Sequence, residues 1–388
     1  MADSSVVVGD ADALSEATRD RVLTGKRVVQ SLVSTAVVVG IFVGVMPRIA
    51  SYGDVWDTIR AMTGLELLGL FLVGIWNLVT YWFVLIAALP GLRLREAAVV
   101  NQASTAVSNT LPGGGAIGVG VALAVLRSWG FRVSAITRSA LVTGIWNNFV
   151  KLGMPVVALA LLAFEGGATV ARAIAALIGI AVLIGSVVGF GLVLRSESAA
   201  ERVGQFFGRL VDRARGLARR RPLGSWAQRA VTFRRDTIGL LQNRWFSLTL
   251  ASLVSHISLY IVLLVALRNV GIGQNILTWI EVLAAFSFVR LVSALPVTPG
   301  GVGVVELGYA AVMTIGMDSA SAAKVVAAIL LFRAITYVLP VPFGAASYMV
   351  WRGNQSWRMD ERERDSALAT RTPRSRYSSP SRSEGSSC

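Results

Sequence analysis

Long apolar runs, separated by short polar segments, are the feature that most limits what this chain can fold into. Six runs approach or exceed the length of about 20 residues that crosses a bilayer as a helix. They are 28–46, 65–89, 135–163, 170–194, 246–268 and 322–350. Only 15% of the 388 residues are charged, whereas an average soluble domain has about 25%. The sequence therefore predicts an all-α polytopic membrane protein and excludes a soluble enzyme of this length.

Two further apolar regions, 97–128 and 277–316, are interrupted by proline and glycine. Proline removes a helical hydrogen bond and glycine destabilises a helix, so we expect both regions to break there. The residues at the two breaks are Pro112, Gly113, Gly114 and Gly115, and then Pro299, Gly300, Gly301 and Gly303. A broken backbone cannot face lipid, so the breaks should face protein or a watery cavity. We interpret both regions as helical hairpins, re-entrant or fully spanning, that return to their starting side.

The order span, hairpin, span occurs twice along the chain, with opposite orientation if each hairpin returns to its starting side. An offset of 185 residues superposes Glu96 on Glu281 and Gly118 on Gly303. Inverted repeats with broken helices near the midplane are a recurring transporter design, and the substrate binds where the repeats meet. The sequence thus predicts an inverted repeat with about six full spans and two broken hairpins.

Polar and charged segments divide the chain into five parts. These are a polar N-terminal segment (1–27), a first membrane half (28–194), a basic linker (195–244), a second membrane half (245–351) and a basic tail expected to be disordered (352–388). The linker holds twelve arginines and four acidic residues. Its apolar residues Val203, Phe206, Phe207, Leu210 and Val211 recur at helical spacing. This spacing predicts an amphipathic helix on the membrane surface.

The net charge of +15 comes from 37 basic and 22 acidic residues. If the N-terminus, residues 90–96 and 127–138, the linker and the tail share one side, that side holds 29 of the 37 basic residues. An excess of arginine and lysine marks the cytoplasmic side of a membrane protein. The distribution predicts a multi-pass protein of the plasma (inner) membrane with both termini in the cytoplasm. It also accounts for the basic composition without a nucleic-acid partner.

Cys388 is the only cysteine and His256 the only histidine. A disulfide within the chain is therefore impossible, and neither a Cys/His metal site nor a Ser–His triad is expected. We predict no metal, no cofactor and no catalytic residues. We interpret His256 as a packed, hydrogen-bonded core residue.

Four charged side chains and two amides lie within or beside the apolar segments, where a charge is costly and normally faces a cavity or a partner. They are Arg290, Glu306, Arg333, Lys151, Asn147 and Asn148. If the three cations and the one carboxylate lined a single cavity, its net charge of +2 would suit a phosphate-bearing lipid. Arginine also makes bidentate contacts with phosphate. We therefore predict that these six residues bind the substrate.

Structural interpretations of the same residues stay open at this point. Arg290 could pair with Glu306 or Glu281 instead of binding a headgroup. Glu306 could pair with Arg290 or Arg333 instead of contacting an amine or carrying a proton. Lys151 could extend along its stem to an interface. The glycines at the breaks could bind an anion at a half-helix N-terminus, or they could only permit tight turns and close packing.

Three motifs resemble a known family. They are 290–306, which ends in Pro-Gly-Gly-x-Gly-x-x-Glu, LLFRAITYVLP around Arg333, and Asn-Thr-Leu-Pro-Gly-Gly-Gly-Ala-Ile-Gly at 109–118. They are similar to the lysylphosphatidylglycerol synthase transmembrane-domain family, the flippase-like membrane domain of the multiple peptide resistance factor, over roughly residues 28–351. The resemblance implies movement of lipids or lipid-linked molecules between leaflets. In that family the lysyl transfer belongs to a separate soluble aminoacyl transferase domain, for which this chain has no room.

We therefore expect an integral membrane translocator of an anionic phospholipid or a lipid-linked substrate, and not an enzyme. Its expected partners are membrane lipids with anionic headgroups, and the sequence allows a homodimer without specifying one. Two alternatives stay open. One is an ion-coupled secondary transporter of a small solute, with Glu306 as the coupling site. The other is a scaffold for a membrane synthase that docks on the arginine-rich linker.

Overall fold

The computed structural model describes residues 43–44, 46–111, 114–167, 170–217, 225–293 and 298–354. Every regular element within these ranges is a helix. Five helical stretches are long and apolar enough to cross a membrane: Gly64–Ala88, Val133–Glu165, Ala173–Arg195, Trp226–Asn269 and Ser319–Gly353. The predicted all-α polytopic membrane fold is therefore confirmed. The predicted segment 1–27, nearly all of the predicted span 28–46 and the predicted tail beyond residue 354 lie outside the described residues.

The helices follow the predicted order of spans and hairpins. The first part of the chain holds α2 (Met46–Ile49), α3 (Tyr52–Arg60), α4 (Gly64–Ala88), α5 (Leu94–Thr110), α6 (Gly114–Ser128), α7 (Val133–Leu162), the π-helical turn η2 (Ala163–Gly167) and α8 (Val170–Arg195). The second part holds α9 (Glu197–Leu217), α10 (Trp226–Asn269), α11 (Trp279–Val292), the 3-10 turn η3 (Pro299–Gly301), α12 (Val304–Met313), α13 (Ser319–Arg333), the π-helical turn η4 (Ala334–Val338) and α14 (Pro340–Gly353). The predicted hairpins are α5–α6 and α11–α12, and each breaks within its Pro/Gly segment.

A glutamate at the third helical position caps the first helix of each hairpin. In α5 the Glu96 carboxylate accepts a hydrogen bond from the Arg93 backbone N–H at 2.9 Å. In α11 the Glu281 carboxylate accepts one from the Thr278 backbone N–H, also at 2.9 Å. Such a carboxylate satisfies a donor at the helix start and interacts favourably with the helix dipole. The offset of 185 residues thus superposes two residues with the same local role.

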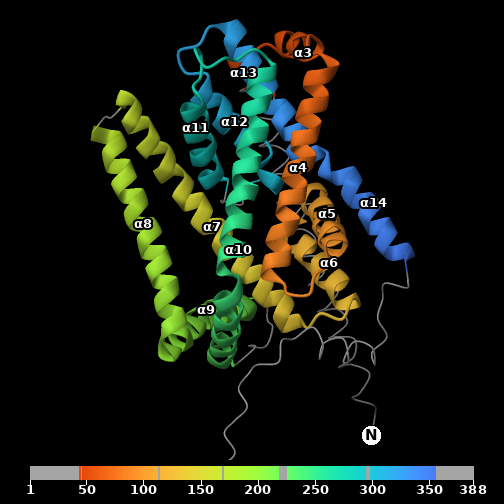
Figure 1. Ribbon diagram of the computed structural model, residues 1–388, viewed down its shortest axis with the longest axis vertical. Coiled ribbons are helices and arrows are strands. Elements are labelled where there is room, and N and C mark those ends of the chain that lie inside the picture. Colours follow the sequence, from red (N-terminus) through yellow and green to blue (C-terminus); the bar gives the residue numbers. More distant parts are fainter. Residues whose placement is uncertain are drawn as a thin grey trace, which may run out of the picture.

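The two hairpins lie toward opposite ends of the bundle. In Figure 1, α5–α6 lies toward the end that carries α9, and α11–α12 lies toward the end that carries α3. Small residues permit the close packing of the first hairpin. A Cβ on Gly114 would lie 2.5 Å from the Ser108 carbonyl oxygen, and a Cβ on Gly118 would lie 2.7 Å from the Ser104 carbonyl oxygen. Any larger residue at either position would push α5 and α6 apart.

The first helix of each hairpin packs against the span that follows the hairpin in the other half. α5 lies along α14, α11 lies along α7, and the spans that precede the two hairpins, α4 and α10, pack against each other. Gly344 on α14 permits the first contact, because a Cβ there would strike the Gln102 backbone and the Ala106 methyl group. The largest core cluster is formed mostly by the second half, including the fully buried Phe286 and Ile329, but it also contains Leu70 and Met154 of the first half. The two halves therefore interlock.

The predicted linker 195–244 is not separate from the span that follows it. α9 forms its first part, and Trp226–Arg244 belongs to α10, which runs unbroken for 44 residues to Asn269. The predicted boundary at residue 245 therefore falls inside a continuous helix.

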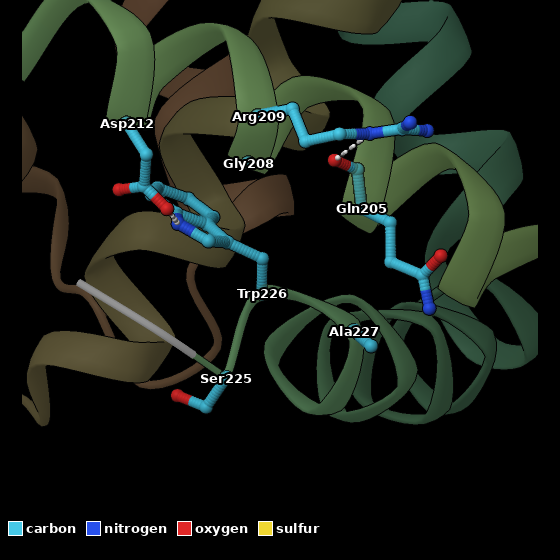
Figure 2. A pocket seen from close by; sticks show the side chains of 7 residues that line it. All are labelled: Gln205, Gly208, Arg209, Asp212, Ser225, Trp226 and Ala227. Carbon is cyan, nitrogen blue, oxygen red and sulfur yellow. Dashed lines mark hydrogen bonds between the residues drawn. The ribbon is translucent and has the colours of Figure 1, made fainter. Parts of the chain in front are cut away.

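One face of α9 is fixed to the start of α10. The Trp226 indole lies against Gly208, where a Cβ would come within 2.5 Å of the ring, and its Nε1–H donates to Asp212 Oδ2 at 3.1 Å (Figure 2). A groove of about 460 Å³ opens between the two helices here, with Gln205 and Arg209 also in its wall. The apolar residues predicted for the amphipathic helix lie elsewhere on α9 and are exposed, with Phe206 at 60%.

Candidate functional site

Glu306 is buried at the start of α12, directly after the second break. Glu306 is 3% exposed, and both of its carboxylate oxygens accept a hydrogen bond. Oε2 accepts from the Gly303 backbone N–H at 2.8 Å, and Oε1 accepts from Arg333 Nε at 2.7 Å. The carboxylate therefore closes the first turn of α12 and forms an ion pair with α13. Of the two pairings that the sequence left open for Glu306, the structure has the one with Arg333.

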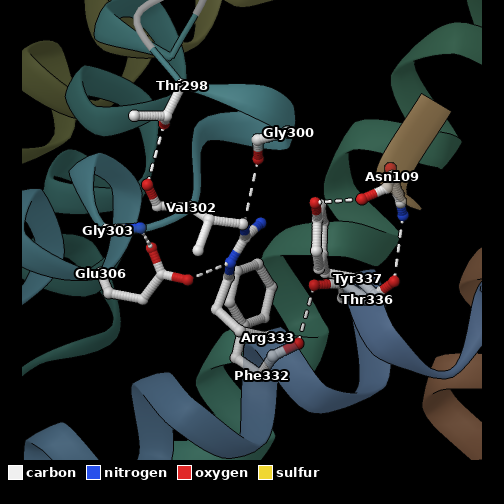
Figure 3. A network of polar contacts seen from close by, with 10 residues as sticks. All are labelled: Asn109, Thr298, Gly300, Val302, Gly303, Glu306, Phe332, Arg333, Thr336 and Tyr337. Carbon is white, nitrogen blue, oxygen red and sulfur yellow. Dashed lines mark hydrogen bonds and ion pairs between the residues drawn. The ribbon is translucent and has the colours of Figure 1, made fainter. Parts of the chain in front are cut away.

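Arg333 binds the second break from the other side. Besides its contact with Glu306, its Nη2 donates to the Gly300 carbonyl oxygen at 3.0 Å. Its guanidinium carbon lies 4.5 Å from the centre of the Tyr337 ring (Figure 3). The charge is thus satisfied by a carboxylate, a carbonyl and an aromatic face. Arg333 therefore acts first as a structural clamp on the break.

Tyr337 joins this clamp to the first hairpin. Its hydroxyl donates to the Asn109 carbonyl oxygen at 2.6 Å, and Asn109 Nδ2 donates back to the Tyr337 carbonyl oxygen at 3.0 Å (Figure 3). Tyr337 lies in the π-helical turn η4, where the Leu339 N–H bonds to the Ala334 carbonyl oxygen. Such π turns occur often at functional sites. A continuous polar network therefore connects the end of α5 to η3 and α12.

Arg290, in the last turn of α11, carries a charge that no described carboxylate neutralises. Its Nε is buried and has no hydrogen-bond partner within the described ranges. Arg290 forms no ion pair with any described residue. Its electrostatic interactions are with Tyr309 on α12, Arg333 on α13 and Tyr81 on α4. The charge therefore points into the region where these helices meet.

Lys151 brings a second cation to the same region. It is half-buried on α7, and its charge interacts with that of Arg290 and with His256 on α10. No described carboxylate forms an ion pair with Lys151 either. Two like charges held near each other in a medium of low dielectric repel strongly. An anion bound between them would relieve that repulsion.

Buried neutral groups with unused hydrogen-bonding atoms surround the two cations. Asn147 Nδ2 donates to the Tyr81 hydroxyl at 3.4 Å, while Asn147 Oδ1 is buried without a partner in the described part of the chain. His256 Nδ1 contacts the Ser252 carbonyl oxygen at 2.9 Å, and its Nε2 is likewise unpartnered. The Tyr309 hydroxyl is a third such group. A buried polar atom left unpaired costs about 1–3 kcal/mol, so several together indicate a place for water or a ligand.

We call these five residues the polar cluster. They are Asn147, Lys151, His256, Arg290 and Tyr309. Aromatic rings lie on the side of the cluster formed by Tyr309. The Tyr309 ring stacks on Phe286 with ring centroids 6.5 Å apart and meets Phe332 edge-on with centroids 5.8 Å apart. The cluster therefore combines two cations, several neutral polar atoms and an apolar wall inside the helix bundle.

The profile described as "Lysylphosphatidylglycerol synthase TM region" matches residues 28–344. The chain belongs to this family. The match begins before α2 and ends at residue 344 near the start of α14, so it includes both breaks, the clamp at Arg333 and the polar cluster. The resemblance that the motifs indicated is therefore confirmed. No curated protein matches the chain.

The six predicted side chains fall into three groups in this family member. Arg290, Lys151 and Asn147 lie in the polar cluster. Glu306 and Arg333 pair with each other, and Arg333 also interacts electrostatically with Arg290. Asn148 is exposed and does not belong to the cluster. Among the described residues, no group of three or more His, Cys, Asp or Glu side chains could hold a metal ion.

The residues at the breaks have different roles. Gly114 permits close packing, while a Cβ on Gly115 would meet nothing within 4 Å. Gly301 and Gly303 have φ angles of +70° and +83°, and Gly303 also gives its N–H to the Glu306 carboxylate. The other predicted members of the first break, Pro112 and Gly113, lie outside the described residues. Pro299 begins η3.

Sequence reasoning missed most of the neutral groups in and around the site. Tyr309 follows Glu306 by three residues, so helical spacing places it one turn further along the same helix. His256 is buried, as expected of a core residue, but one of its ring nitrogens has no partner in the described part of the chain. Tyr81 has no local signal. Tyr337 and Asn109 lie in motifs that carried the family resemblance, but their pairing could not be predicted, because they are 228 residues apart.

Proposed function

We propose that this protein moves an anionic phospholipid, or a lipid-linked molecule with an anionic headgroup, between the leaflets of the membrane. The observation that carries the proposal is the pair of cations, Arg290 and Lys151, which lie inside the bundle without a described carboxylate partner. A charge within a membrane protein is costly and normally serves a pathway or a substrate. The family to which the chain belongs supports a membrane role, and an anionic headgroup supplies the missing counter-charge.

The charge balance favours a lipid phosphate over an ion-coupled solute. The only carboxylate predicted for the site, Glu306, already accepts a hydrogen bond on each oxygen. It is therefore a poor candidate for carrying a coupling ion. Glu306 and Arg333 neutralise each other, so the remaining charge of the site is the two positive charges of Arg290 and Lys151. We propose that the headgroup binds there while the acyl chains stay in the bilayer, so that no covalent bond is made or broken.

The proposal includes an inverted repeat with hairpins that enter from opposite sides. Three observations support it. The contact of α5 with α14 corresponds to the contact of α11 with α7 under the exchange of halves. Both hairpins start with the same glutamate cap, and they lie toward opposite ends of the bundle (Figure 1). In transporters of this kind one repeat rocks against the other around a fixed site.

We also propose that both termini lie in the cytoplasm of a cell whose plasma (inner) membrane holds the protein. Cys388 is the only cysteine, so it reports the side of the C-terminus without further engineering. A membrane-impermeant maleimide is expected to label it in inverted vesicles and after permeabilisation, but not in intact spheroplasts. Labelling of intact spheroplasts would reverse the proposed orientation. A Cys388→Ser variant provides the background signal.

Lipid exchange in liposomes tests the transport function directly. The substrate is phosphatidylglycerol with a fluorophore on one acyl chain, so that its headgroup stays natural, and dithionite quenches the label in the outer leaflet. We expect the wild-type protein to exchange this lipid faster than phosphatidylcholine with the same label. Arg290→Gln and Lys151→Gln are each expected to lower the rate at least tenfold, because each removes charge-assisted hydrogen bonds of about 1.5–3 kcal/mol.

Lys324→Gln is the matched control, since Lys324 also lies in an apolar helix but is exposed and absent from the polar cluster. It should exchange lipid at the wild-type rate. Folded wild-type protein that moves no anionic lipid above the rate of empty liposomes would overturn the proposal. Equal loss in Lys151→Gln and Lys324→Gln would overturn the assignment of the headgroup to the polar cluster.

A further inference from the structure

The polar cluster contains hydrogen-bond acceptors as well as cations, and a phosphate cannot satisfy them. His256 Nδ1 lies 2.9 Å from the Ser252 carbonyl oxygen, which can only accept, so Nδ1 carries the hydrogen. In the neutral ring Nε2 is then an acceptor. Asn147 Oδ1 is a carboxamide oxygen and therefore also an acceptor, and the Nδ2 of the same amide donates to the Tyr81 hydroxyl. Both acceptors are buried without a partner in the described ranges.

The groups that would satisfy these acceptors are hydroxyls. A phosphodiester has no hydrogen to donate, so it pairs with Arg290 and Lys151 but leaves Asn147 and His256 unpaired. An ammonium group would donate, but it would lie beside two positive charges, and like charges at a few ångströms repel. A hydroxyl donates without adding charge and can accept in turn from the Tyr309 hydroxyl.

We infer that the polar cluster binds a headgroup with both a phosphate and free hydroxyl groups, such as a glycerol, inositol or sugar phosphate. The inference rests on the proposed function and specifies its substrate class. The phosphate lies at Arg290 and Lys151, and the hydroxyls lie at Asn147 and His256. A headgroup with a lysyl ester, which adds two amines to one phosphate, does not fit a site whose free charges are both positive.

The burial of the two acceptors strengthens the argument for hydroxyls. Asn147 Oδ1 and His256 Nε2 are both buried atoms, so bulk water does not reach them. Where water is limited, an unpaired acceptor costs its full desolvation penalty. A site built to bond a hydroxyl therefore rejects a ligand that lacks it.

Two lipids of equal charge separate this inference from the proposed function. Phosphatidylglycerol carries one phosphate and two hydroxyls, and phosphatidylmethanol carries the same phosphate without a hydroxyl. With the label on the acyl chain of each, we expect the wild-type protein to exchange phosphatidylglycerol about tenfold faster, the effect of one buried hydrogen bond or more. Equal rates for the two lipids would overturn the inference and leave the proposed function intact.

Variants assign the preference to particular side chains. In Asn147→Leu and His256→Leu the ratio of the two rates is expected to fall toward one, while both anionic lipids are still exchanged faster than phosphatidylcholine. Asn148→Leu, a change at the exposed neighbouring amide, should keep the wild-type ratio. A preserved ratio in both Asn147→Leu and His256→Leu would overturn the assignment of hydroxyls to these residues. Because the wild-type comparison needs no variant, a variant that fails to fold does not remove the test.

Soluble glycerol phosphate distinguishes a lipid headgroup from a free phosphate with the same chemistry. Proteoliposomes are given radiolabelled glycerol phosphate, and uptake is compared with that of empty liposomes. Lipid exchange without uptake supports both the headgroup inference and the proposed function. Uptake without lipid exchange would keep the hydroxyl-bearing phosphate as ligand but overturn the lipid-translocating function. Neither uptake nor exchange by folded protein would overturn both.

Discussion

Replacing Glu306 by alanine is expected to destabilise the fold by about 3–5 kcal/mol, the typical effect of removing one partner from a buried ion pair. Two groups lose their acceptor at once. Arg333 Nε loses its carboxylate at 2.7 Å, and the Gly303 N–H at the start of α12 loses its bond of 2.8 Å. Since α12 has only ten residues and begins at a break, the loss of its cap should spread along the helix.

The measurement is unfolding by SDS in mixed micelles, followed by circular dichroism. Glu281→Ala is the matched control, because Glu281 caps α11 by the same contact to a backbone N–H but is exposed and forms no ion pair among the described residues. Glu281→Ala should lower the free energy of unfolding by no more than the loss of an ordinary cap, about 0.5–2 kcal/mol.

A double-mutant cycle isolates the ion pair itself. Arg333→Met removes the cation and keeps the length of the side chain, and the double variant with Glu306→Ala should be less destabilised than the sum of the two single changes. Strict additivity, or equal costs for Glu306→Ala and Glu281→Ala, would contradict the role assigned to the pair.

Sequence patterns predicted the features of this fold that depend on local chemistry. Apolar runs of sufficient length mark the spans, and the Pro/Gly segments mark both breaks, because these properties act within a few residues. Glu96 and Glu281 were predicted only to correspond in the repeat; their capping role, which depends on a spacing of three residues, came from the structure. The predicted boundary at residue 245 fell inside α10, because basic and apolar residues can continue one helix without a break in its hydrogen bonds.

Partners across helices could not be predicted in the same way. The sequence left Glu306 with two candidate cations, and the choice of Arg333 depends on how α13 packs against α12. Asn109 and Tyr337 are 228 residues apart, and nothing in either segment points to the other. Tyr309 and the unpartnered nitrogen of His256 escaped for a further reason: an isolated tyrosine or histidine in an apolar run looks the same whether its polar atom is satisfied or not.

The glycines are the clearest example: the sequence grouped six of them at the two breaks, and the five that the structure describes have different physical roles. Gly115 has no atom within 4 Å of its added Cβ, so its small size is not needed there. Gly300 combines a φ angle of +60° with direct contact to the Tyr337 ring, and its carbonyl oxygen accepts a hydrogen bond from Arg333. Composition alone cannot separate the two cases, whereas substitution by alanine can.

Gly300→Ala is expected to be the second most damaging single change. A left-handed conformation costs an alanine about 1–2 kcal/mol, and the added methyl group would overlap the Tyr337 ring, which adds about 1–3 kcal/mol of strain. The ring can move away only by giving up its contacts with Arg333 and Asn109, so the two breaks would separate. We therefore expect both a lower free energy of unfolding and a lower rate of lipid exchange.

Gly115→Ala is the matched control at the other break. It lies within α6 in open space, where alanine favours a helix by about 0.5–1 kcal/mol over glycine, so stability should be unchanged or slightly raised. A Tyr337→Phe change separates the two causes of the Gly300→Ala effect, since it keeps the ring and removes the hydroxyl that bonds Asn109. If Gly300→Ala exchanges lipid and unfolds like the wild-type protein, the connection between the breaks through Tyr337 is not required. If only Gly300→Ala and Tyr337→Phe slow exchange, the network from Asn109 to Gly300 couples the two halves during transport.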